Sequence, residues 1–216
     1  MSYRKKYEED LRKDSQNVFE EHRLCKKGEG RWLIKRKREE GWESMYAAEI
    51  ICLFNNSIYV GGDIDTVVFS YGPPENEQRL RWLGRQTSGT EYLREKASIG
   101  MGGRELVEDW DPQCAREELR EALEELEKEE KEEEGEVDHE EEKETLRHAL
   151  RLIDDGSSAV WQVLYDIPDS WESFENLGQV TSPKVFYAQA AVAKLCELLG
   201  LFEEKSEPEP EPKKDP

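Results

Sequence analysis

The fold of this chain is decided by residues 31–72, which read RWLIKRKREEGWESMYAAEIICLFNNSIYVGGDIDTVVFSYG. Short runs rich in β-branched and aromatic residues alternate here with turn residues, at Glu40-Gly41, Asn55-Asn56 and Gly61-Gly62-Asp63. Such runs are typical of β-strands, and connections this short leave no room for a crossover helix. The stretch therefore predicts an antiparallel meander of about four strands.

Both faces of the second strand in this stretch are apolar. Tyr46, Ala48, Ile50 and Cys52 share one face, and Ala47, Ile51 and Leu53 share the other with a glutamate. Because a sheet face of this kind needs cover, we expect helices over one face and part of the other.

The rest of the chain has helical spacing of its apolar residues. Short helices are expected around Leu80 and Tyr92, and Asp111-Pro112 is a strong helix start. That helix carries Leu119, Leu123 and Leu126, and a second one from about Asp138 to Gly156 carries Leu146 and Leu150, so the two predict an antiparallel αα-hairpin with a glutamate-rich tip. Residues 185–201, VFYAQAAVAKLCELLGL, are apolar on most sides and predict a central helix.

The expected class is α+β, a small antiparallel meander packed on helices with an acidic helical arm. We divide the chain into a basic N-terminal helix (1–30), the sheet (31–72), short helices (73–110), the acidic hairpin (111–155), a helical core segment (156–202) and a disordered tail (203–216). The tail reads EEKSEPEPEPKKDP, which cannot bury apolar area.

Charge is the dominant compositional feature. The chain has 216 residues, with 51 acidic and 31 basic side chains and a formal net charge of −20. Residues 117–144 hold seventeen acidic and four basic residues, a net charge of about −13. We therefore do not expect direct nucleic-acid binding by the chain as a whole, and any such contact needs a local basic patch.

Other classes of protein are disfavoured by what the sequence contains. No apolar run approaches a membrane span, and the first residues, MSYRKKYEEDLRKD, lack the apolar core of a signal peptide. The four cysteines are far apart, so we expect reduced thiols. The glycine groups KKGEGRW and IGMGGRE match neither a dinucleotide nor a P-loop motif. We expect no cofactor, no metal and no catalytic residue.

A turn with two carboxylates is the main candidate for a ligand site. Asp63 and Asp65 follow a strand and could hold a cation or act as acid and base. Gly-Gly-Asp is also what a tight turn requires, and we favour this structural interpretation. The alternative is an enzyme or binding module for a small phosphorylated or nucleotide ligand, built from Trp32, Asp63, Asp65, Arg31, Arg81 and Arg85.

A basic stretch accompanies the first strand. Residues 31–38, RWLIKRKR, could bind a nucleotide or RNA phosphate with an aromatic stacked on a base. Lysines and arginines also protect an edge strand from aggregation, and we favour that interpretation.

The sheet resembles a known group of proteins. RWLIKR, SMYAAEI and above all IYVGGDIDTVVFSYG are similar to proteins encoded by tailed bacteriophages and prophages, whose sheet likewise ends in a Gly-Asp-Ile stretch. The similarity continues through RLRWLGR, EYLREKASIGMGG and SPKVFYAQAAVAKLCELL, and leaves out the acidic bend and the tail. No activity is established for this group. The resemblance implies a phage protein that acts in the host bacterial cytoplasm.

We expect a non-enzymatic phage accessory protein that binds a host or phage macromolecule. A defence protein or a nucleic-acid-handling protein is the expected partner, with the acidic arm imitating a phosphate array. Self-association stays open. The expected partner-binding residues are Glu124, Glu125, Glu129, Glu130, Glu133, Glu134, Glu136, Glu140 and Glu141.

Overall fold

The computed structural model describes most of the chain. The described residues are 3–39, 41–63, 65–70, 72–86, 90–99, 108–132, 139–165, 174 and 176–202. The expected disordered tail at 203–216 lies outside them, as do three of the expected partner-binding residues, Glu133, Glu134 and Glu136.

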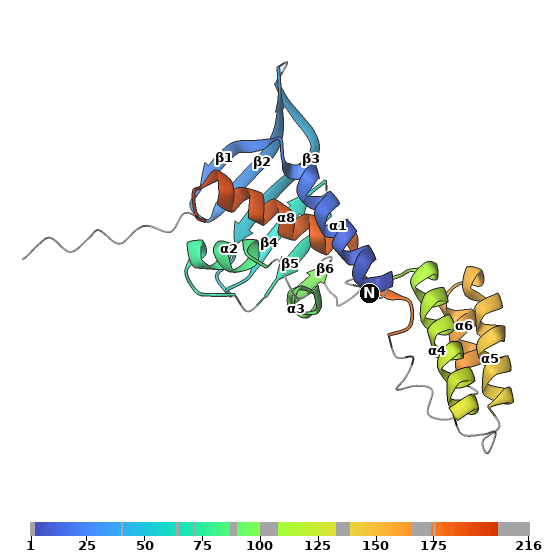
Figure 1. Ribbon diagram of the computed structural model, residues 1–216. Coiled ribbons are helices and arrows are strands. Elements are labelled where there is room, and N and C mark those ends of the chain that lie inside the picture. The colour runs from blue at the N-terminus through green and yellow to red at the C-terminus, as the bar shows by residue number, and fades with distance from the viewer. Residues whose placement is uncertain are drawn as a thin grey trace, which may run out of the picture.

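The α+β class is confirmed, with a meander at its centre. Six strands follow one another in chain order, each antiparallel to the next (Figure 1). They are β1 (His22–Gly28), β2 (Arg31–Arg38), β3 (Gly41–Cys52), β4 (Ile58–Gly62), β5 (Val67–Phe69) and β6 (Ala97–Ile99).

The meander is longer than the four strands expected. The first helix ends at Phe19 and does not extend to residue 30, because His22 and Leu24 pair with β2 as an edge strand. At the other edge, Ala97 and Ile99 are buried in β6, where the sequence predicts the end of a helix. Both additions are edge strands, in which only alternate residues reach the core.

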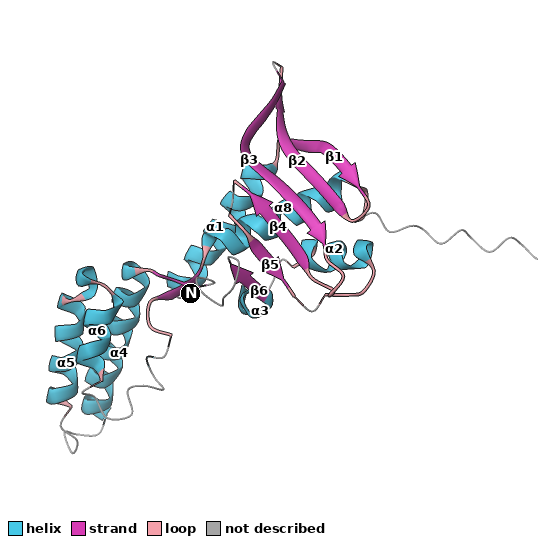
Figure 2. Cartoon of the chain, turned by 180° about the vertical axis from the view of Figure 1, so that it is seen from behind, coloured by secondary structure: helices cyan, strands magenta, loops and turns pink. Residues whose placement is uncertain are grey.

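Helices cover one face of the sheet. They are α1 (Tyr3–Phe19), α2 (Asn76–Gly84), α3 (Thr90–Lys96) and α8 (Pro183–Leu198). The expected central helix is confirmed, since α8 contacts β1, β3, β4 and β5 and is flanked by α1 and α2. Figure 2 shows the opposite face of the sheet, over which none of these helices lies. The expectation of partial cover on that second face is therefore wrong for the helices that the structure describes.

Alternation along the strands separates the two faces. Trp32, Ile34, Ile50 and Val60 point into the core against the helices and are buried. Their neighbours on the second face, which we call the open face, are only half-buried; they include Leu33, Glu49, Ile51, Tyr59 and Val68.

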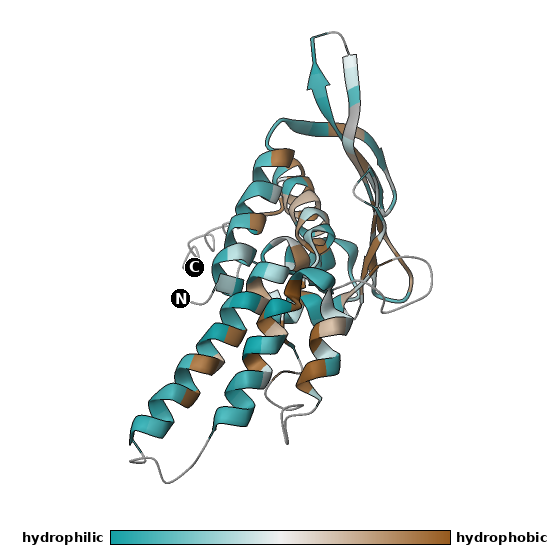
Figure 3. Cartoon of the chain, turned by 90° about the vertical axis from the view of Figure 1, so that its right-hand side faces the viewer, coloured by the Kyte–Doolittle hydropathy of each residue, from teal (hydrophilic) through white to brown (hydrophobic). Residues whose placement is uncertain are grey.

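The acidic region forms a separate helical arm. Helices α4 (Pro112–Glu132) and α5 (Glu140–Arg151) make the expected hairpin, and η1 (Ile153–Asp155) and α6 (Ser157–Leu164) pack on it. The arm has its own core, with Leu119, Leu146, Val160 and Leu164 buried. Figure 3 shows apolar residues interspersed among the hydrophilic residues of the arm helices.

Two short strands connect the arm to the body. They are β7 (Glu108–Trp110) before α4 and β8 (Gln179–Thr181) before α8, and they pair antiparallel. The N-terminal end of α1 lies beside this junction (Figure 1).

Candidate functional site

Asp63 follows β4 and extends its pairing with β3 by one residue, at the end away from the hairpin turn. Its Oδ2 accepts a hydrogen bond from the N–H of Ala47 at 3.1 Å, and its own N–H donates to the carbonyl of Ala47 at 3.1 Å. The preceding Gly62 has φ +127°, and a Cβ there would collide with the same carbonyl. These contacts are structural, because they fix the end of the β3–β4 pairing at the point where the chain leaves β4.

Asp65 has different partners. Its Oδ1 accepts the N–H of Thr66 at 2.7 Å, and its Oδ2 lies 2.6 Å from the ammonium of Lys184, in the first turn of α8. The hydrogen bond from Lys184 holds the pKa of Asp65 below its usual value. Among the described residues, no group of three or more His, Cys, Asp or Glu side chains is arranged to hold a metal ion.

The other residues of the alternative ligand site are dispersed. Trp32 faces the helices and is only 7% exposed, whereas Arg31 lies on the open face with its Nε 2.7 Å from Glu49. Arg81 pairs along α2 with Glu77 at 3.8 Å, and Arg85 packs over the ring of Phe202. Among the described residues, no hydrogen bond or ion pair joins these four side chains to Asp63 or Asp65, so they do not form a common ligand site with the two carboxylates.

In the acidic arm, the charge of α5 is largely neutralised by its own cations. Lys143, whose side chain is 4% exposed, lies 2.6 Å from Glu130 of α4 and 3.8 Å from Glu140. Arg147 pairs with Glu140 at 2.9 Å and with Glu144 at 3.7 Å. Two expected partner-binding residues, Glu130 and Glu140, are thus engaged within the arm.

The outer face of α4 is different. Glu121, Glu124, Glu125 and Glu129 are exposed, and none of them makes an ion pair with any residue that the structure describes. We call these four residues the acidic row. Glu121 was not among the expected residues, although its spacing of three and four from Glu124 and Glu125 could have indicated it. Glu141 is exposed on α5.

The base of the arm is fixed to the body by charged hydrogen bonds. Glu118 of α4 lies 2.6 Å from Arg4 of α1 and accepts the N–H of Gly178 at 2.8 Å. Glu8 of α1 accepts the hydroxyl of Thr181 at 2.8 Å. These bonds join α1, α4 and β8 and set the direction in which the arm projects.

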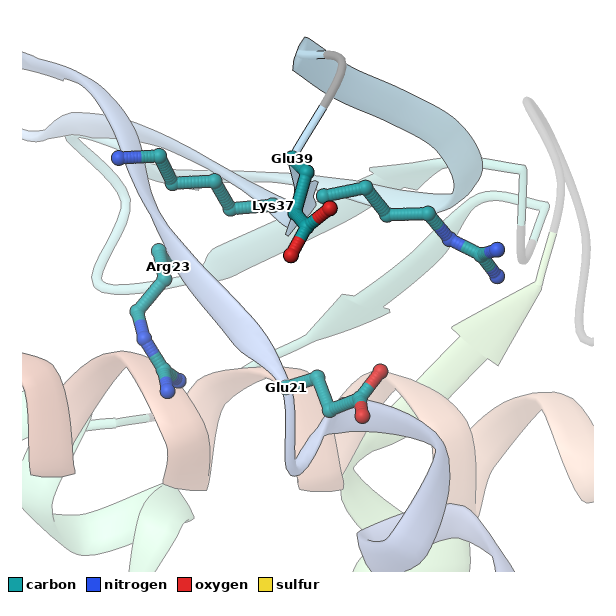
Figure 4. A pocket seen from close by; sticks show the side chains of 5 residues that line it. Glu21, Arg23, Lys37 and Glu39 are labelled. Carbon is teal, nitrogen blue, oxygen red and sulfur yellow. The ribbon is translucent and has the colours of Figure 1, made fainter.

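A basic concavity lies at the other end of the molecule, where β2 and β3 extend beyond the body. Figure 4 shows its lining, in which three cations stand beside two glutamates; the residues are Glu21, Arg23, Lys37, Arg38 and Glu39. The sequence identified the basic stretch 31–38, and it placed Arg23 in the basic N-terminal segment without joining it to this surface. The pairing of Arg23 with Lys35 across the strands brings it to this surface.

Comparison with known proteins finds no relative of this chain. No family model, curated protein or solved structure matches the chain. Within the described residues, no helix combines the length and the apolar character that a membrane crossing requires.

Proposed function

We propose that the protein is a non-enzymatic phage accessory protein that captures a basic host or phage macromolecule on its acidic arm. A basic groove that normally holds nucleic acid fits this surface best, as in a defence protein or a nucleic-acid-handling protein. The acidic row is the observation that carries the proposal.

The spacing of the acidic row supports imitation of phosphates. From Glu121 to Glu129 the helix advances eight residues, about 12 Å at about 1.5 Å per residue. Four carboxylates over that length are spaced on average about 4 Å along the axis, with individual steps of about 1.5 to 6 Å. Phosphates follow one strand of duplex DNA at about 3.4 Å along its axis, so the two charge densities are similar.

The helix that carries the acidic row is also held in a fixed position. Its buried core and the ion pair between Arg4 and Glu118 hold α4 in place before any partner binds. Preorganisation of this kind lowers the entropic cost of association.

Capture from host lysate tests the proposal. The tagged chain is compared with a variant in which Glu121, Glu124, Glu125 and Glu129 are all replaced by Gln, which keeps size and helix propensity. A matched control removes the same charge from exposed sites elsewhere, by Glu9→Gln, Asp10→Asn, Glu20→Gln and Glu91→Gln.

We expect the wild type and the control to capture the same partner, and the acidic-row variant to lose it. Capture should weaken steeply between about 50 and 200 mM salt, because exposed charges are screened over about 8 to 10 Å at physiological ionic strength. Equal capture by all three proteins would contradict the proposal.

A further inference from the structure

Among the described residues, the basic side chains on one face of the β2–β3 hairpin form ion pairs, and those on the other face do not. Because side chains alternate along a strand, Arg36 and Arg38 lie on one face and Lys35 and Lys37 on the other. Arg36 lies 3.2 Å from Glu21 and 3.9 Å from Glu43, and Arg38 lies 2.8 Å from Glu43. The first face is therefore neutralised within the protein.

The cations of the second face lie outside the ion pairs that the structure describes, although Glu39 lines the same concavity as Arg23 and Lys37. Lys35 and Lys37 make no ion pair with a described residue, and neither do the neighbouring cations of β1, Arg23 and Lys26. Arg23 pairs in register with Lys35, and Lys26 with Leu33, so all four cations lie on the open face of the ribbon. Because the net charge of the chain is −20, a nucleic acid can bind only where the protein presents a local positive surface of this kind.

An aromatic side chain stands within this surface. Trp42 is the cross-strand partner of Lys37 and is 46% exposed, although tryptophan usually buries most of its area. Exposed aromatic rings beside cations form stacking platforms for unpaired bases. An acidic peptide would use the cations but would leave the ring without a partner, so the tryptophan favours a nucleic acid.

We propose that this face of the β1–β2–β3 ribbon binds single-stranded nucleic acid. Arg23, Lys26, Lys35 and Lys37 contact phosphates, and Trp42 stacks on a base. The site is independent of the acidic arm, which lies at the opposite end of the molecule (Figure 1). One end would thus hold a nucleic acid while the other imitates one.

Fluorescence anisotropy with a labelled 20-nucleotide thymidine strand tests the proposal, with a duplex of equal length as the comparison. We expect tighter binding of the single strand, because duplex bases are already stacked on one another. Four phosphate contacts predict a slope of log affinity against log salt of about −3, or about a 50-fold loss between 50 and 200 mM salt.

Two sets of variants separate charge from stacking. Replacing Lys26, Lys35 and Lys37 with Gln should reduce the slope by about two units, whereas Gln at Lys5, Lys6 and Lys13 of α1, a control of equal charge, should leave it nearly unchanged. Trp42→Leu should weaken binding at least about fivefold, and Trp42→Phe less. All substituted residues are at least partly exposed, so circular dichroism should show an unchanged fold.

Equal affinity for strand and duplex, wild-type affinity of the three-lysine variant, or no effect of Trp42→Leu would overturn the proposal. So would sedimentation showing that the chain self-associates at low salt through these lysines while the thymidine strand does not bind. That last result would mean that the ribbon binds the acidic arm of a second copy of the chain.

Discussion

The guanidinium of Arg4 lies 2.6 Å from a carboxylate oxygen of Glu118, and this pair ties the first helix of the body to the first helix of the acidic arm. Glu118 belongs to the acid-rich stretch of the sequence, yet its role is structural. Its second oxygen accepts the N–H of Gly178 beside β8. The direction of the arm thus depends on one of its own glutamates.

The Arg4–Glu118 pair should be measurable as a coupling energy. A double-mutant cycle with Arg4→Gln and Glu118→Gln, followed by urea unfolding, should give about 1 kcal/mol, because each side chain is about one quarter exposed and solvent screens the pair. A coupling energy near zero would mean that the pair does not hold the joint.

Arg79 should be the most sensitive arginine of the body. It is 2% exposed and donates to the carbonyls of Pro73, Pro74, Leu53 and Ser57 and to the side chain of Asn56. Arg79→Lys leaves several buried acceptors unsatisfied, so the free energy of unfolding should fall by about 3 kcal/mol. The neighbouring Arg81, whose side chain is 37% exposed, serves as the control, and its change to Lys should lower the free energy of unfolding by under about 0.5 kcal/mol. Similar losses for both variants would refute this role of Arg79.

The carboxylates at 63 and 65 should act in the turn and not in metal binding. Asp63→Ala removes the acceptor for the N–H of Ala47, and we expect a loss of about 1 to 2 kcal/mol in unfolding free energy. Millimolar Mg²⁺, Mn²⁺ or Ca²⁺ should leave the Tm of the wild type unchanged. A rise of several degrees that Asp63→Ala abolishes would establish a metal site instead.

His22 should make stability depend on pH. The side chain is fully buried, its Nε2 lies 3.1 Å from the carbonyl of Tyr46, and burial lowers its pKa below the usual 6.5. The unfolded chain then binds this proton more readily, so the free energy of unfolding should fall as pH drops below about 6.5.

Replacing His22 with Gln, which keeps an amide donor for the carbonyl of Tyr46, should remove that part of the pH dependence. The exposed His148, changed to Gln, serves as the control and should retain it. Identical pH profiles of unfolding free energy for both variants would show that His22 is not the responsible group.

The strands of the meander could be predicted because their periodicity is local. Trp32 and Ile34 alternate with Leu33, and the alternation alone indicates which side chains meet the core. β1 was missed because HRLCKKG presents mostly polar residues to solvent, and only its pairing with β2 shows that it is a strand.

The candidate surfaces depend on contacts that no local pattern shows. The sequence gives α4 and α5 similar runs of glutamate, but only the packing of Lys143 and Arg147 neutralises one helix and leaves the other charged. Trp42 comes to lie opposite Lys37 because the register between β2 and β3 shifts after Ile34, near Tyr46, whose φ is +57°. Such shifts are not encoded in hydrophobic periodicity.

Competition between this protein and DNA for one partner shows whether the acidic row occupies the site of a nucleic acid. The captured partner is bound to a labelled DNA duplex, and the protein is added with Lys26, Lys35 and Lys37 changed to Gln so that its own ribbon does not bind the DNA. If the acidic row imitates phosphates, this protein displaces the duplex, and adding the four Gln substitutions of the acidic row abolishes the displacement. If the partner binds the duplex and the protein at the same time, or if the duplex is displaced equally well without the acidic row, the acidic row does not imitate a nucleic acid.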